Sequence, residues 1–107
     1  PPAYEFDAHT APLGITFIRG ESLPPRYKNS ALVALHGSWN RSEKIGYQVV
    51  FLHFDKNDHI SEHDFMTGFE VDGDVIGRPV DIAEGKNGNI YISDDFTGSV
   101  YLVTYQK

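Results

Sequence analysis

The chain has 107 residues, of which 15 are acidic and 9 basic, so its formal net charge is −6, and it contains no cysteine. This balance, without a basic run, excludes a duplex-tracking nucleic-acid surface, and no apolar stretch reaches the ~20 residues of a membrane-spanning helix. The lack of cysteine excludes disulfides, thiol nucleophiles and cysteine-based zinc sites. A hydrophobic share of 40% and an aromatic share of 13% predict a packed core, with neither a nucleic-acid partner nor a transmembrane segment.

The apolar runs are short, rich in β-branched and aromatic residues, and bounded by Gly, Pro, Asn and Asp, which is typical of β-strands. The run at residues 31–35 is continuous enough for burial on both faces. An Asn-Gly pair within residues 86–89 favours a tight hairpin turn. In chain order, the predicted strands are residues 3–6, 15–18, 31–35, 47–54, 63–66, 79–83, 90–93 and 100–105.

The strand pattern restarts near residue 78, which indicates an internal repeat. In the proposed alignment residues 11–15 match 78–82, residues 32–35 match 90–93, and residues 49–54 match 100–105. Repeats of three or four antiparallel strands, about 40–50 residues each, build β-propellers. A small antiparallel sandwich would show the same strand pattern.

We predict an all-β fold of antiparallel propeller blades, with about two blades present. Residues 7–70 would form one blade, residues 71–107 most of the next, and residues 1–6 the outer strand of an adjacent blade. Two blades cannot close a ring, because propellers have about four to eight. Together with the Pro-Pro start, this favours a segment cut from a longer protein, whose open blade edges could pair copies into a homo-oligomer.

Antiparallel order within each blade sorts the connections onto two faces. Connections that enter the innermost strand, or join the second strand to the third, share one face. On this first face we place residues 9–11, 36–41, 77–78 and 94–95, and on the second face residues 19–29, 55–62 and 84–89. The first set is chemically varied and the second is turn-like and acidic, so we expect function on the first face.

Arg78 precedes Pro79, which restricts its backbone to extended conformations. Because the strand that follows is the innermost of its blade, the guanidinium could reach the propeller axis. Its fork of donors would suit a carboxylate or phosphate on a ligand. The alternative is an ion pair across the top of the blade with Asp81 or Asp94.

The loop at residues 36–41 has the sequence His-Gly-Ser-Trp-Asn-Arg and follows a buried strand directly. Gly37 permits close backbone approach, and Trp39 offers a flat platform on which a sugar or planar cofactor could stack. An equally good interpretation is a structural hairpin loop in which Trp39 fills a gap between blades.

The histidines and acids predict no metal site. His59 and His63 are four residues apart, but the segment before His63 has the composition of a solvated turn. Asp94 and Asp95 could hold a cation, orient Arg78, or serve as turn acids before Thr97-Gly98.

Six strings of the sequence together resemble a known family. They are HTAPLGITF (9–17), HGSWNR (36–41) followed by GYQVV (46–50), DFMTGF (64–69), and GRPVDIA (77–83) with NGNIYISDD (87–95). In this order, over nearly the whole chain, they resemble the C-terminal part of PQQ-dependent sugar dehydrogenases, specifically the sorbosone-dehydrogenase branch of the soluble aldose-dehydrogenase family.

The resemblance implies a six-bladed propeller with pyrroloquinoline quinone (PQQ) in a central funnel. In such enzymes the quinone takes a hydride from C1 of a sugar, aldose or aldehyde, a histidine is the general base, and Ca²⁺ polarises the quinone carbonyl. Arg78 corresponds to a family arginine that contacts the cofactor. His36 or Arg41 would supply a cationic contact from the loop that also carries Trp39, and His9 would lie at the funnel mouth.

The resemblance also implies what this segment lacks. The family's general base and main calcium ligands lie on earlier blades, so we predict no catalytic residue and no metal ligand here. The expected function is a segment of a quinoprotein oxidoreductase that supplies cofactor contacts, in a periplasmic or extracellular protein. The alternative is a non-catalytic propeller module, in one version a trimer of two-blade chains, that binds a glycan or protein partner on Trp39.

Overall fold

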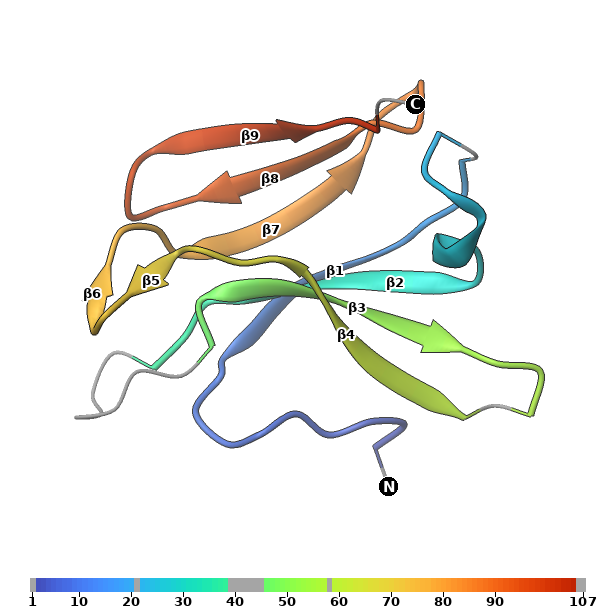
Figure 1. Ribbon diagram of the computed structural model, residues 1–107, viewed down its shortest axis with the longest axis horizontal. Coiled ribbons are helices and arrows are strands. Elements are labelled where there is room, and N and C mark those ends of the chain that lie inside the picture. The colour runs from blue at the N-terminus through green and yellow to red at the C-terminus, as the bar shows by residue number, and fades with distance from the viewer. Residues whose placement is uncertain (1, 21, 39–45, 58, 106–107) are drawn as a thin grey trace.

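A computed structural model describes residues 2–20, 22–38, 46–57 and 59–105. Four strands form a first antiparallel sheet in chain order, and three form a second. The first sheet contains β1 (Pro12–Phe17), β2 (Ser30–Leu35), β3 (Gln48–Phe54) and β4 (Ile60–Met66), and the second contains β7 (Pro79–Glu84), β8 (Ile90–Asp94) and β9 (Ser99–Val103) (Figure 1). The all-β prediction is confirmed.

Two smaller elements complete the described part of the chain. A two-stranded hairpin, β5 (Glu70–Val71) and β6 (Asp74–Val75), joins the sheets, and a 3₁₀ turn at Pro25–Tyr27 lies in the β1–β2 connection. No described segment is a helix of the length and apolarity needed to cross a membrane. Neither small element was predicted, because each is too short for a periodic pattern to reveal it.

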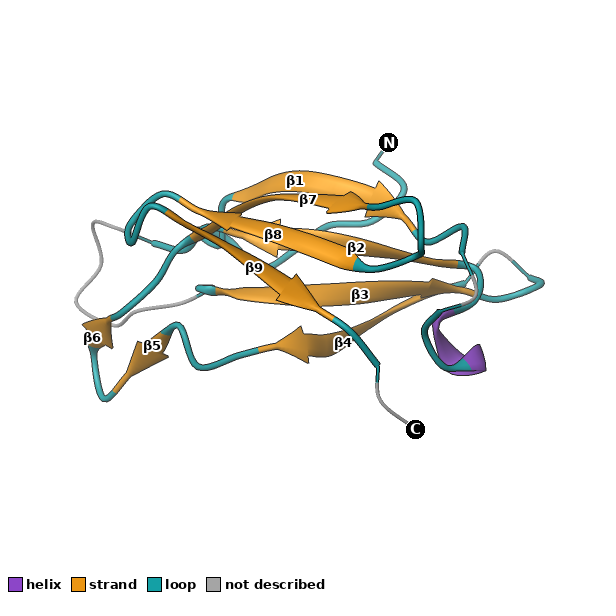
Figure 2. Ribbon diagram, turned by 90° about the horizontal axis from the view of Figure 1, so that it is seen from above, coloured by secondary structure: helices purple, strands orange, loops and turns teal. Residues whose placement is uncertain are grey.

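The two sheets pack through the faces that they turn toward each other. Leu32, Ala34, Val49 and Phe51 of the first sheet join Ile82, Ile90 and Ile92 of the second in one buried cluster. β1 and β7 run side by side, and the outer strands diverge from them (Figure 2). This is the arrangement expected of neighbouring propeller blades, each with its innermost strand near the axis.

Gly14 brings β1 and β7 together. A Cβ added at Gly14 would lie 2.4 Å from Asp81 Oδ1 and 2.6 Å from Asp81 Cα, and the second of these is a backbone atom that cannot move alone. Any side chain at residue 14 would therefore push the two innermost strands apart.

The other face of the first sheet is covered by the start of the chain. Val33, Leu35, Val50 and Leu52 form a second buried cluster, against which Tyr4 and Phe6 pack. Residues 3–6 were predicted as a strand, but they are assigned to no strand, and no described strand pairs with them. Their placement in an adjacent blade stays a prediction.

The predicted strand at residues 63–66 was too short. β4 begins at Ile60 rather than His63, and its first residues pair with the end of β3, with Ile60 opposite Phe54. Most of β4 is exposed, so it lacks the alternation of polar and apolar residues that marks a half-buried strand. The expected second-face loop at residues 55–62 is correspondingly shorter.

The internal repeat is confirmed in topology but needs a correction in register. Ile15 of β1 lies opposite Val33, and the matching Ile82 of β7 lies opposite Ile92. Val33 therefore corresponds to Ile92, whereas the proposed alignment matched it to Tyr91. The error is one residue, and a one-residue slip exchanges the two faces of a strand.

The corrected register explains the open face of the second sheet. Tyr91 occupies the position of Leu32, and Leu102 that of Phe51, yet these two are 40% and 54% exposed while Leu32 and Phe51 are core residues. The outer face of the second sheet thus repeats the face through which the first sheet packs on its neighbour. It has the composition of a surface that receives another blade.

The second-face connections of the two sheets are tied together. The Glu84 carboxylate accepts hydrogen bonds from the backbone N–H groups of Arg19 (2.9 Å) and Gly20 (2.8 Å). The Ser22 hydroxyl donates to the Asn87 carbonyl. These contacts fix the β1–β2 connection of one sheet against the β7–β8 turn of the other.

On the first face, one buried carboxylate joins three parts of the second sheet. Asp94 Oδ1 accepts the backbone N–H groups of Arg78 (3.0 Å), Phe96 (2.9 Å) and Thr97 (3.1 Å), and Oδ2 accepts the Tyr101 hydroxyl (2.8 Å). Burial by itself raises the pKa of the Asp94 carboxyl, but these hydrogen bonds to the charged form outweigh it and leave the pKa below the ordinary value of 3.8.

The contact at Gly14 predicts a specific loss of stability. Gly14→Ala should lower the free energy of unfolding by about 1–3 kcal/mol, because the added methyl group meets the backbone of β7. Chemical denaturation of the intact protein measures this, with Lys86→Ala in the exposed β7–β8 turn as the control. Equal stability of Gly14→Ala and wild type would show that the two strands are not in close contact.

The lowered pKa of Asp94 predicts an acid-sensitive contribution to stability. The contribution should be complete above about pH 5 and should be lost as the pH falls through the folded-state pKa, because unfolding then releases a carboxyl that takes up a proton more readily. Asp94→Asn should cost about 1–3 kcal/mol at neutral pH, since its amide nitrogen cannot accept the Tyr101 hydroxyl. Its unfolding free energy should also fall less steeply with acid than that of wild type, and an equal slope would contradict this role.

Candidate functional site

The first-face connections come together, as the antiparallel order predicts. The described ends of the β2–β3 connection, residues 36–38 and 46–47, lie at the same edge of the molecule as the β8–β9 turn, on the left in Figure 1. The His36 N–H donates to the Ala11 carbonyl and the Gly37 N–H to the Thr10 carbonyl, both at 2.9 Å. The segment before β1 is therefore held against the segment after β2.

His36 forms a contact between the two sheets. Its Nε2 lies 2.9 Å and 3.0 Å from Oδ1 and Oδ2 of Asp95, which follows β8. The His36 side chain is 15% exposed and that of Asp95 57%, so the contact lies at the boundary between core and solvent. Because an ionised carboxylate only accepts hydrogen bonds, Nε2 carries the hydrogen.

Arg78 lies beside His36. Its backbone N–H is fixed by Asp94 at 3.0 Å, its Nε–H donates to the His36 carbonyl at 3.3 Å, and its Cζ lies 5.9 Å from the centre of the Tyr47 ring. The alternative of a side-chain ion pair with Asp81 or Asp94 is wrong, since the ion pairs of the described residues do not include Arg78 and the Asp94 carboxylate binds its backbone. Among the described residues, none accepts a hydrogen bond from the terminal guanidinium nitrogens of Arg78.

Tyr47 is a site residue that sequence reasoning did not select. It is buried, and its hydroxyl donates to the Ser38 carbonyl. Gly37 has φ +99°, and a Cβ there would lie 2.6 Å from the Tyr47 ring, so only glycine fits. The sequence signal that could have indicated this contact is Gly37 directly after β2 together with an aromatic residue, Tyr47, just before β3.

The other predicted site residues have different outcomes. His9 is exposed, has φ +67°, and lies next to Thr10 on the same face. No hydrogen bond or ion pair joins its side chain to the described part of the chain. Trp39 and Arg41 lie outside the described residues, so the predictions for them stay predictions.

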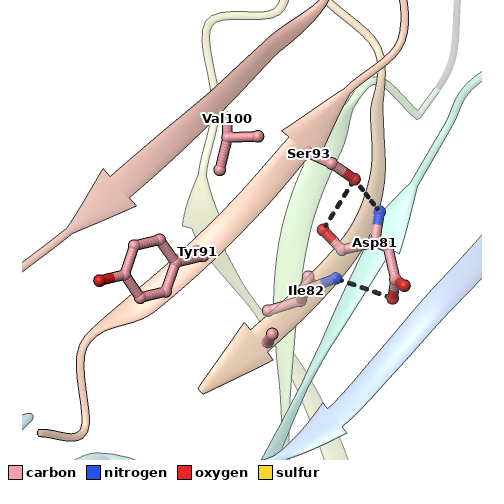
Figure 3. Close-up of a pocket in the computed structure, with 6 residues that line it drawn as sticks. Asp81, Ile82, Tyr91, Ser93 and Val100 are labelled. Atoms are coloured by element: carbon pink, nitrogen blue, oxygen red, sulfur yellow. Dashed lines mark hydrogen bonds between the residues drawn. The ribbon is translucent and has the colours of Figure 1, made fainter. Parts of the chain in front are cut away.

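A shallow hollow on the outer face of the second sheet is separate from this cluster. It is lined by Asp81, Ile82, Ala83, Tyr91, Ser93 and Val100 (Figure 3). The Asp81 N–H donates to Ser93 Oγ at 3.2 Å, and Val100 is 68% exposed. Because this face repeats the one that packs between the sheets, we assign the hollow to packing rather than to the functional site.

The cluster therefore offers a defined set of groups: the Arg78 guanidinium, the His36 imidazole, the Tyr47 ring and the exposed Asp95 carboxylate. The guanidinium retains donors for a planar anion, such as a carboxylate. Within the described ranges, no three His, Asp or Glu side chains group together as a cation site.

Comparison with solved structures confirms the blade architecture. The holo form of the PQQ domain of pyranose dehydrogenase from Coprinopsis cinerea is 28% identical, with a TM-score of 0.66 over 91% of this chain and 27% of that domain. An iodide structure and a calcium structure of the Trichoderma reesei carbohydrate-active enzymes family AA12 are each 24% identical, with TM-scores of 0.69 over 89% of this chain and about a quarter of theirs. These two show the fold alone.

Comparison at the sequence level places the chain in a family. An uncharacterized protein of Borreliella burgdorferi is 43% identical over 110 residues, which cover 100% of this chain and 29% of that protein. The chain thus spans less than a third of the relatives it matches. The expected sorbosone-dehydrogenase branch stays a prediction. The model of the TrAA12-like family matches residues 1–106, and the chain belongs to this family.

Proposed function

We propose that this chain is the part of a carbohydrate oxidoreductase that contributes to the binding of PQQ, through Arg78 and His36. The observation that carries the proposal is the position of Arg78, whose backbone and Nε are fixed while its terminal nitrogens face no described acceptor. The likeness to a holo PQQ domain over 91% of the chain supports it.

The chemistry of these residues fits the cofactor. PQQ is a planar quinone that carries carboxylates, and a guanidinium offers paired donors to a carboxylate. The Nε contact with the His36 carbonyl at 3.3 Å restricts the rotation of the Arg78 fork before any ligand arrives. Less conformational entropy is then lost on binding.

The side chains around Arg78 shape the same site. The buried Tyr47 ring lies beside the guanidinium, with its centre 5.9 Å from Cζ. Gly37 leaves room for this ring, since any Cβ there would meet it. In this proposal, the residues around Arg78 bind and orient a ligand at this edge.

The chemistry of the whole protein belongs to the same proposal. PQQ, when bound, accepts a hydride from C1 of a sugar or aldehyde, and the resemblance of the sequence to sugar dehydrogenases supports a substrate of this class. We assign the general-base histidine and the calcium ligands that this resemblance implies to the remainder of the intact protein.

Replacement of Arg78 tests the proposal. Arg78→Ala should weaken PQQ binding by about 10- to 100-fold, the effect of losing hydrogen bonds to a charged group. Arg78→Lys keeps the charge but loses the planar fork, so its affinity for PQQ should lie between that of wild type and that of Arg78→Ala. Fluorescence titration of the intact protein with PQQ in the presence of Ca²⁺ measures both.

Arg19→Ala is the matched control, because Arg19 is exposed and lies on the opposite edge of the sheets. It should bind PQQ as wild type does. An Arg78→Ala protein with unchanged PQQ affinity and turnover would contradict the proposed role.

A further inference from the structure

Two adjacent aspartates at the start of the β8–β9 turn have different partners. Asp94 points into the protein and is 3% exposed, with all its contacts to the second sheet and its turn. Asp95 points outward and reaches across to His36 of the first sheet. The inference that follows concerns Asp95, and it rests on the proposed function of His36 as a cofactor contact.

The backbone on both sides of this contact is fixed. The N–H groups of Phe96 and Thr97, which follow Asp95, are bound by the Asp94 carboxylate, and the Gly98 N–H donates to the Asp94 carbonyl at 3.0 Å. The His36 N–H is bound at 2.9 Å by the Ala11 carbonyl. The 2.9 Å contact therefore joins two side chains whose backbones are each fixed within their own sheet.

The contact determines which edge of the imidazole remains available. Both oxygens of Asp95 lie within hydrogen-bond distance of Nε2, and the carboxylate accepts the hydrogen that Nε2 carries. Nδ1 makes no hydrogen bond with the described residues. In the neutral ring Nδ1 is an acceptor and in the charged ring a donor, and in both states it is the ring nitrogen without a partner among the described residues.

We propose that Asp95 is a positioning residue: it holds His36 in the Nε2–H form and directs Nδ1 toward the cofactor beside Arg78. The carboxylate does not touch the cofactor in this arrangement. It fixes the ring orientation before binding, as acidic partners of metal-bound or catalytic histidines do. Without the Asp95 carboxylate, the His36 ring is free to rotate and to carry its hydrogen on either nitrogen.

The test combines a tautomer measurement with a binding measurement. In intact protein labelled with ¹⁵N-histidine, at a pH where the ring is neutral, the His36 nitrogens should show the Nε2–H tautomer in wild type. Asp95→Ala should give a mixture of both tautomers and bind PQQ about 10-fold more weakly. Asp95→Glu, which restores a carboxylate, should recover much of both properties. Asp74→Ala, at an exposed position of β6, is the control and should change neither.

The outcomes separate this inference from the proposed function. If Asp95→Ala leaves the His36 tautomer unchanged, the positioning role is overturned, whatever the affinity. If the tautomer changes but PQQ affinity does not, His36 does not meet the cofactor through Nδ1, and the inference is also overturned. If wild type fails to bind PQQ while Arg78 and His36 are intact, the proposed function fails, and the tautomer data still decide whether Asp95 orients the ring.

Discussion

The buried carboxylate of Asp94 is the interaction on which the functional edge of this structure depends. It receives four hydrogen bonds, from the start of β7, from the β8–β9 turn and from β9. A buried carboxylate without donors would be strongly unfavourable, so the segments that supply them must stay together. The same contacts fix the backbone of Arg78 and of the residues that follow Asp95. One structural anion thus determines where two of the site side chains lie.

Much of the fold could be predicted, because buried strands carry a clear pattern. The continuous run of β2 and the restart of the pattern at β7 indicate two similar sheets, and antiparallel order alone places the connections. Three features differ from the prediction for physical reasons. Exposed β4 has no apolar alternation, the β5–β6 hairpin is too short for one, and residues 3–6 pack by side chains without pairing. The one-residue error in β8 arose because the β1–β2 connection (residues 18–29) is longer than the β7–β8 connection (residues 85–89), so spacing along the chain does not carry the register from one sheet to the other.

The candidate site was predictable in its location but not in its contacts. The expectation that Arg78 and the residues after β2 share a face follows from topology and holds. The identity of their partners depends on the register between the sheets, which leaves no sequence signal. For this reason the Asp95 contact with His36 and the packing of Tyr47 under Arg78 were not foreseen. The open face around Tyr91 and Val100 follows from the same register and explains why about two blades present a large apolar surface.

These observations describe a two-sheet part of a propeller. Its first face holds the Arg78 guanidinium and the His36 imidazole in fixed positions. A crystal structure of the intact protein with PQQ bound tests this account most directly. It should show a cofactor oxygen about 2.7–3.2 Å from a terminal nitrogen of Arg78, with His36 Nδ1 facing the same ligand and Asp95 still on Nε2. A bound PQQ that lies away from both residues, with the His36–Asp95 contact intact, would contradict it.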